Sequence, residues 1–311
     1  MITREMILEE LNNRNLKYGD YETNLIIDYL INLYELNLLP DNITYRDLIA
    51  KLEKYNVNVV FFDENHEVNQ KWGNEFKGNT YTEENGNTTI YVRNSLIDKE
   101  LYFYHELTHL FQKRENKQNI EFNYTGLTDD NGYGMMFNEV ATQTLAERIY
   151  NNKYNLSSEF ILYDSGNLRM LSGYEIWSDL KNYQSFDYII SLFIESIGLT
   201  KEDIIKEAFK NKYNFMNILE AKSKVLSWTK FEDLKFIFEY IFCVDNVFYT
   251  NIEQREKLIK GESVDWEHID YLFVNEAGLN REKQLQLYKI ICENLKMQIE
   301  QNNEIKTNNL N

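Results

Sequence analysis

Hydrophobic residues recur every three or four positions through most of this chain, which is the spacing of an α-helix with one apolar side. Residues 2–55 show this spacing first, and Pro40, the only proline, ends the main part of the unit before a shorter helix over Tyr45–Tyr55. The apolar side of that main part consists of Ile26, Ile27, Tyr29, Leu30, Leu33 and Tyr34. The pattern predicts an N-terminal helical segment.

The composition changes between Val57 and Arg93, where β-branched and aromatic residues become frequent. Val57–Phe62 and Thr88–Arg93 are the predicted strands, and the glycine- and asparagine-bearing stretch between them predicts hairpin connections. These segments predict a small sheet. Thr88–Arg93 either offers its edge to an extended peptide or simply ends the sheet.

Two helices are predicted after the sheet. Asn94–Ser95 offers a helix start, and Leu96–Lys113 follows with helical periodicity. Its apolar side consists of Leu101, Tyr104, Leu107, Leu110 and Phe111. The next predicted helix covers Met135–Ile149 and is entered from the turn Asp129–Gly134. The paired acids Asp129 and Asp130 could bind a metal, but such a pair in a glycine-bearing loop usually marks a turn.

Beyond residue 155 nearly all of the chain has helical periodicity. Gly198 marks a helix stop, and Thr200–Asp203 marks a capped start. The tail from Asn302 onward is rich in asparagine and is predicted to be disordered. The helices predicted in this region are Phe186–Ile197, Lys201–Lys210, Asn214–Leu226, Phe231–Phe242 and Glu282–Glu300.

The predicted fold class is α+β and mostly helical, with a small mixed sheet packed on the active-site helix and an all-helical C-terminal region. A chain of 311 residues with 43% hydrophobic content can bury one sizeable core or two small ones. The predicted segments are an N-terminal helical segment (1–55), a catalytic core (56–152), a helical C-terminal region (153–300) and a disordered tail (301–311).

The run His105-Glu106-Leu107-Thr108-His109 is the main candidate for chemistry. Residues four apart on a helix lie on one face, so both imidazoles can reach a single metal ion. Glu106 then sits beside the metal, where a carboxylate can take a proton from a zinc-bound water and pass it to a leaving amine. The alternative is an ordinary amphipathic helix whose two histidines are satisfied by hydrogen bonds.

A catalytic zinc site usually has three protein ligands and a water in the fourth position. On the helix Met135–Ile149, a polar or small face carries Glu139, Thr142, Gln143 and Ala146, and Glu139 is the predicted third ligand. Glu147 lies two turns further along the same helix. It could be another ligand or a partner of a ligand, or it could pair with Arg148 or solvent.

The motif at His105–His109, followed by Asn138-Glu139 on a later helix, resembles the gluzincin metallopeptidases, the thermolysin-like and aminopeptidase-like group. The resemblance covers about residues 55–150. It implies that His105, His109 and Glu139 bind Zn2+ and that Glu106 acts as general base and acid.

Two departures from that pattern concern the second helix. Thermolysin-like enzymes place an aspartate four residues after the ligand glutamate, where it orients a zinc-bound histidine, whereas this chain has Gln143 there. An amide accepts the same hydrogen bond but raises ligand basicity less. The step from His109 to Glu139 is also longer than in thermolysin and closer to that of ImmA/IrrE-type peptidases, although no DNA-recognition helix is legible.

Gluzincins also tend to supply a tyrosine or histidine that stabilises the oxyanion of the tetrahedral intermediate. Tyr133, before the Glu139 helix, and Tyr174 are the two predicted candidates for this catalytic role. His268 could serve if the C-terminal helices fold back over the cleft, and a solvated surface position is the alternative. His66 lies between turn-rich segments and is predicted to have no catalytic role.

Charge and cysteine content limit the classes of partner that we expect the protein to bind and the compartment in which we expect to find it. A net charge of −17 argues against nucleic acid as a binding partner. The charge favours a basic or neutral peptide over an acidic one, or it serves only to keep the protein soluble. Cys243 and Cys292 form no disulfide framework, which is compatible with a reducing compartment. The N-terminus lacks a secretory signal and no apolar run is long enough to cross a bilayer, so we expect a cytoplasmic protein. Leaderless export would give the same pattern.

The sequence therefore predicts a zinc-dependent metallopeptidase that hydrolyses a peptide or protein substrate, with no nucleic-acid or membrane partner. One alternative is a catalytically silent, peptidase-like interaction protein that keeps the zinc site. Another is a zinc-stabilised structural module. Structural zinc sites are usually closed by four ligands rich in cysteine, and neither cysteine is near the motif.

Overall fold

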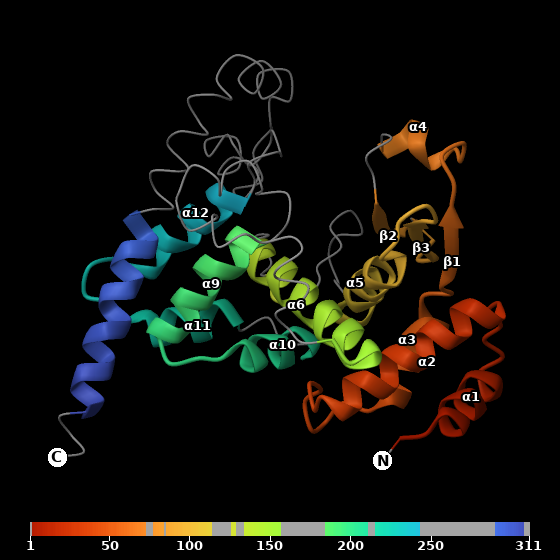
Figure 1. The fold of residues 1–311 in the computed structure, drawn as a ribbon, viewed down its shortest axis with the longest axis horizontal. Coiled ribbons are helices and arrows are strands. Elements are labelled where there is room, and N and C mark those ends of the chain that lie inside the picture. Colours follow the sequence, from red (N-terminus) through yellow and green to blue (C-terminus); the bar gives the residue numbers. More distant parts are fainter. Residues whose placement is uncertain are drawn as a thin grey trace. The chain divides into compact units, whose positions relative to one another are not determined.

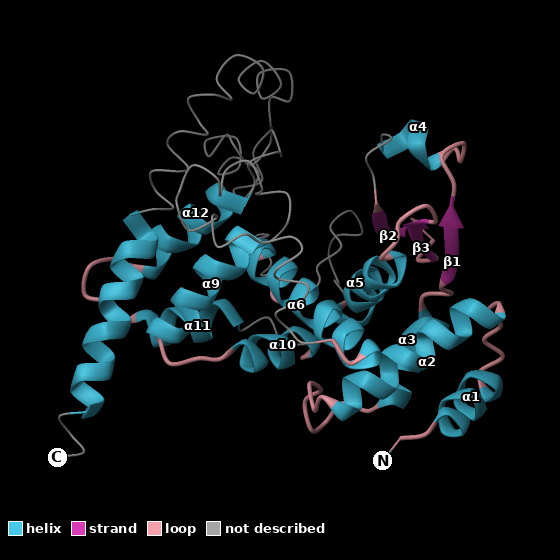
Figure 2. Ribbon diagram, in the orientation of Figure 1, coloured by secondary structure: helices cyan, strands magenta, loops and turns pink. Residues whose placement is uncertain are grey.

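The computed structural model describes residues 2–72, 77–83, 85–113, 126–128, 134–156, 184–210, 215–242 and 290–307. The chain forms two compact units, each assembled from separate stretches of sequence. The first comprises Met1–Gly126, Ala141–Phe160 and Ile205–Asn211, and the second comprises Leu127–Val140, Ile161–Ile204 and Lys212–Asn311. The described parts are mostly helical with one small sheet (Figures 1 and 2), which confirms the predicted fold class.

Three helices open the first unit: α1 (Arg4–Asn13), α2 (Asp20–Glu35) and α3 (Tyr45–Lys54). Helix α3 begins with a capping box, because Thr44 Oγ1 accepts from the amide of Asp47 while the Asp47 carboxylate accepts from the amide of Thr44. The predicted apolar side of α2 is buried except for Tyr34, which is partly exposed.

The sheet contains β1 (Asn58–Phe62), β2 (Gly78–Thr82) and β3 (Thr88–Arg93), with the short helix α4 (Val68–Trp72) between β1 and β2. Its order is β1-β3-β2, with β1 parallel and β2 antiparallel to β3. The sheet is therefore mixed, as predicted.

Two details of the sheet differ from the sequence prediction. Thr88–Arg93 was expected to offer an edge or end the sheet, and this was wrong because β3 is the central strand and pairs on both sides. Alternation in sequence identifies a strand but not its place in the sheet. Strand β2 lies in the stretch predicted as hairpin connections, because Gly78 and Asn79 at its start favour turns and hide the strand-favouring residues Thr80–Thr82.

Helix α5 (Lys99–Gln112) contains the motif and packs against β2 and β3, with α2 and α3 also in contact with it (Figure 1). It begins at Lys99 with Asp98 as N-cap, three residues later than predicted. All five residues of its predicted apolar side are buried. Thr108, inside the motif, donates to the carbonyl oxygen of Tyr104 at 2.7 Å, so its hydroxyl oxygen accepts from the buried Tyr29 hydroxyl of α2 at 2.8 Å.

Helix α6 (Met135–Tyr154) follows Gly134, whose φ of +99° favours glycine. A Cβ at this position would lie 2.5 Å from the carbonyl oxygen of Leu127. The C-terminal part of α6 belongs to the first unit, where Lys153 Nζ lies 2.7 Å from Glu100 Oε2 on α5 and 2.9 Å from Asp28 Oδ2 on α2. These carboxylates raise the pKa of Lys153, although burial acts against them.

The remaining helices are α9 (Gln184–Ser196), α10 (Lys201–Phe209), α11 (Phe215–Ser223), α12 (Phe231–Phe242) and a helix over 290–307. In the second unit, the ring of Phe137 lies within 6 Å of the rings of Phe193, Phe215 and Phe238. These edge-to-face contacts form an aromatic core.

The predicted stop and start before α10 are confirmed. Gly198 has a φ of +73°, and Thr200 and Asp203 cap each other across the first turn. The prediction of disorder from Asn302 onward was wrong as far as residue 307, where the last described helix ends. Asn302 Nδ2 donates to the carbonyl oxygen of Ser196 at 2.9 Å, a tertiary contact that local composition does not reveal. Among the described residues, no helix has the length and apolar character needed to cross a bilayer.

Lys113, just after α5, is a lysine with only 8% of its surface exposed. Its Nζ donates to Thr82 Oγ1 and lies 4.4 Å from the centre of the Tyr55 ring. Burial lowers the pKa of Lys113 to about 8 from 10.5. The folded state therefore holds this proton less tightly than the unfolded chain does.

We predict that the contribution of Lys113 to the free energy of unfolding rises between about pH 8 and 10.5, the interval between the folded and unfolded pKa of Lys113. The whole shift corresponds to at most about 3 kcal/mol. Lys113→Met should remove this rise and stabilise the protein near neutral pH, because Thr82 and Thr88 keep the 2.9 Å bond between their hydroxyls. Urea denaturation across this pH range measures the effect, and parallel curves for parent and variant would contradict it.

Candidate metal centre

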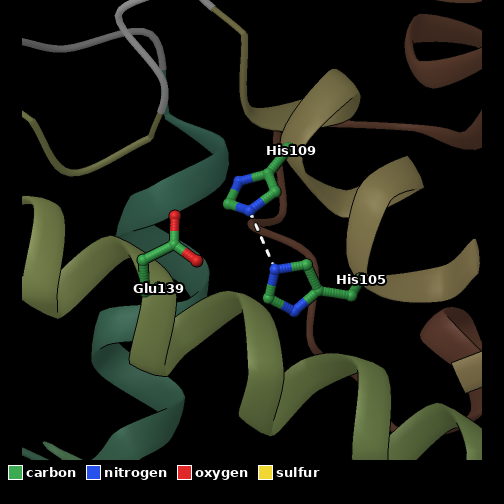
Figure 3. Close-up of side chains that lie close together, drawn as sticks. All are labelled: His105, His109 and Glu139. Atoms are coloured by element: carbon green, nitrogen blue, oxygen red, sulfur yellow. Dashed lines mark hydrogen bonds between the residues drawn. The ribbon is translucent and has the colours of Figure 1, made fainter. Parts of the chain in front are cut away.

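The two histidines of the motif face each other from successive turns of α5 (Figure 3). Their Nε2 atoms are 3.0 Å apart, and the ring centroids are 4.7 Å apart with an interplanar angle of 78°. His105 is 6% exposed, and His109 is partly exposed. One turn of helix therefore brings the two imidazoles to a common point, as the spacing predicted.

Glu139 joins the two histidines from α6. His105, His109 and Glu139 each offer a ligand atom, and these atoms all lie within 4.8 Å of one another. Figure 3 shows the carboxylate turned toward the rings. Helix α6 is continuous from Met135 to Tyr154, so Glu139 lies one turn before Gln143, which contacts His105 directly.

The residues of this cluster fit a divalent metal. Two imidazole nitrogens and a carboxylate oxygen suit zinc and also other borderline cations. Ligand atoms about 2.0–2.1 Å from a tetrahedral zinc lie about 3.3 Å from one another. The ring nitrogens are already close to that spacing at 3.0 Å. Three protein ligands would leave a fourth position for water or substrate.

Glu106 lies between the two histidines in sequence and is 7% exposed. Strand β2 holds its side chain, since Thr80 Oγ1 lies 3.0 Å from Glu106 Oε2 and 2.7 Å from the Glu106 carbonyl oxygen. Gly78, on the same strand, leaves room for the carboxylate. A Cβ at Gly78 would lie 3.2 Å from both Cγ and Oε1 of Glu106. Sequence reasoning missed Thr80 and Gly78, because β2 itself was not recognised.

Gln143 occupies the position at which thermolysin-like enzymes have an aspartate. Its Oε1 lies 2.9 Å from Nδ1 of His105, and its Nε2 donates to Glu147 Oε1 at 2.8 Å. The amide thus makes the contact expected of it. Of the roles considered for Glu147, this contact supports that of a partner of a ligand, because Glu147 accepts from the amide that contacts His105.

Two buried contacts hold the first half of α6. Thr142 Oγ1 donates to Gln112 Oε1 on α5 at 2.9 Å. The side-chain oxygen of Asn138, which is 1% exposed, accepts from the amide of Leu127 at 3.1 Å. Asn138 therefore anchors the chain that leads into α6, next to the residue that supplies the acid.

The remaining candidates from the sequence are Tyr133, Tyr174, His268, the pair Asp129–Asp130 and His66. Tyr133, Tyr174, His268 and the pair Asp129–Asp130 lie outside the described residues. His66 lies just before α4, where its Nδ1 accepts from the amide of Val68 at 3.2 Å and its ring packs near that of Phe62. These contacts give His66 a structural role.

We predict that the metal-free protein binds one zinc ion and that Glu139→Gln weakens this binding by at least about 100-fold, because the amide keeps the shape of the side chain but removes the anionic ligand. Competition with a chromophoric chelator measures the affinity. Glu220→Gln, at an exposed position on α11, is the control for the loss of one negative charge. Equal affinity of Glu139→Gln and the parent would remove Glu139 from the ligand set.

Scans of family models, of curated proteins and of solved structures each found no match to this chain. The chemical interpretation therefore rests on the residues themselves. Its basis is the convergence of His105, His109 and Glu139, with Glu106, which follows His105 on α5, hydrogen-bonded to Thr80 of β2.

Proposed function

We propose that this protein is a metal-dependent peptidase of the gluzincin type, with zinc held by His105, His109 and Glu139. The observation that carries the proposal is the meeting of these three side chains from α5 and α6, with a buried glutamate, Glu106, directly after His105 in the same helix. A metal bound there would polarise the scissile carbonyl and lower the pKa of a bound water. The chain's own residues supply the remaining functions.

Glu106 is the general base and acid in this proposal. Its carboxylate takes a proton from the attacking water and returns it to the leaving amine. A hydroxyl group both donates and accepts, so Thr80 can bond Glu106 in either protonation state. It donates to Oε2 of the carboxylate, or it accepts from the protonated acid while it donates to the Glu106 carbonyl oxygen. The two short contacts of Thr80 Oγ1 support this role.

Strand β2 also supports a peptide as the substrate. Within the described residues, β2 pairs only with β3, so its other edge can add an extended segment through backbone hydrogen bonds. This is the same strand that contacts Glu106. A peptide added to β2 would therefore lie along the strand that holds the general base.

We predict that Glu106→Gln keeps zinc affinity and lowers kcat by about 1,000-fold or more, because an amide cannot accept the proton. A fluorogenic peptide library, assayed with and without a chelator, identifies a responsive peptide on which to measure the variant. Glu220→Gln is the matched control at an exposed site. Turnover by Glu106→Gln at the parent rate would exclude the mechanism, and zinc binding without turnover in the parent would favour the catalytically silent alternative.

We predict a smaller loss when the contacts of Glu106 with β2 are altered. Thr80→Val should lower kcat by about tenfold, because it removes the hydrogen bond that positions the base. Gly78→Ala should have a similar effect by displacing the carboxylate. Thr89→Val is the control, since Thr89 lies on the adjacent strand β3, where it is paired with Tyr81 and not with Thr80. Both test variants should retain zinc affinity, and unchanged kcat in both would show that β2 does not position Glu106.

A further inference from the structure

Behind the candidate metal centre, three side chains form a continuous hydrogen-bonded chain. His105 Nδ1 lies 2.9 Å from Gln143 Oε1, and Gln143 Nε2 donates to Glu147 Oε1 at 2.8 Å. Glu139, Gln143 and Glu147 follow one another at intervals of four residues on α6. One face of the helix therefore carries the acid of the cluster, an amide and a second acid on successive turns.

The chemistry of these groups sets the direction of the hydrogen bonds. A carboxylate only accepts, so the amide nitrogen of Gln143 must face Glu147. The amide oxygen of Gln143 then faces His105, and an amide oxygen also only accepts. Nδ1 of His105 must therefore carry the hydrogen, which leaves the lone pair on Nε2. That is the nitrogen directed at His109 and at the candidate metal position.

We propose that Glu147 is a positioning residue that acts through Gln143 to hold His105 in the tautomer required for metal binding. Without an anionic acceptor at position 147, the amide of Gln143 can turn over and present its nitrogen to the ring. His105 Nδ1 would then accept, and the hydrogen would move to Nε2, where it blocks ligation. The carboxylate of Glu147 removes this second arrangement.

The relevance of this inference to catalysis rests on the proposed function. The tautomer of His105 itself is a property of the metal-free protein and can be measured without any activity. Glu147 accepts from Gln143 Nε2 at 2.8 Å and acts on His105 through this amide. Its influence is on the fraction of molecules whose His105 is ready to bind metal. A ligand partner of this kind typically changes metal affinity by about 10–100-fold.

The direct test is nitrogen NMR of the metal-free protein with labelled histidine, at a pH where the imidazoles are neutral. The chain has four histidines, so single substitutions assign the signals. We expect His105 in the parent to carry its hydrogen on Nδ1. Glu147→Gln keeps the size of the side chain but can both donate and accept, so it should give a mixture of the two tautomers. Zinc affinity, measured by chelator competition, should fall by about tenfold.

The exchanged pair Gln143→Glu/Glu147→Gln is the matched control. It preserves the net charge and the number of hydrogen-bonding groups, and it places a carboxylate, which only accepts, directly against the ring. The inference therefore predicts that His105 returns to the Nδ1–H tautomer and that zinc affinity recovers to at least the parent value. Loss of charge alone would leave Glu147→Gln weaker but would not change its tautomer.

Three results would overturn the inference: a parent protein with His105 protonated on Nε2, a Glu147→Gln variant with the parent tautomer, or an exchanged pair with the same mixture as the single variant. The parent spectrum needs no substitution, so a variant that fails to fold does not remove the test. The expected tautomers in a protein that cleaves no peptide would contradict only the proposed function. Peptidase activity with a His105 tautomer independent of position 147 would contradict only this inference.

Discussion

The structure around the candidate site depends on the burial of polar side chains along α5. This helix packs against the sheet and against neighbouring helices, so His105, Glu106 and Thr108 of the motif are buried. A buried polar group without a partner costs about 1–3 kcal/mol, so a partner on a neighbouring element stabilises the fold. The partners are Gln143 for His105, Thr80 for Glu106, Tyr29 for Thr108 and Thr142 for Gln112.

The residues of the candidate site come from three different elements. Helix α5 supplies the two imidazoles and Glu106, helix α6 supplies Glu139 and the residues behind His105, and strand β2 supplies the contacts of Glu106. In a thermolysin-like arrangement one aspartate both orients the histidine and carries the charge. Here an amide makes the contact, and Glu147, one turn further along α6, carries the charge.

Local periodicity was sufficient to predict α2, α5 and α12. A helix repeats every 3.6 residues, so its apolar side can be recognised in the sequence. The interaction of His105 with His109 follows from the same repeat. Strand β2 was missed because its residues resemble a turn and its stability comes from pairing with β3. The helix beyond Asn302 was missed for a related reason, since polar residues there are ordered by contacts with a distant part of the chain.

By itself the sequence determined the mostly helical α+β class, the position of the motif on one face of a helix, and the presence of an acid and an amide one turn apart on a later helix. These are local properties, set by side-chain spacing and backbone geometry. Tertiary structure decided the rest: the order of the strands, the contact of Thr80 with Glu106, and the contact of Gln143 with His105. Such contacts join residues far apart in sequence, and they form only because packing buries polar groups that must then find partners.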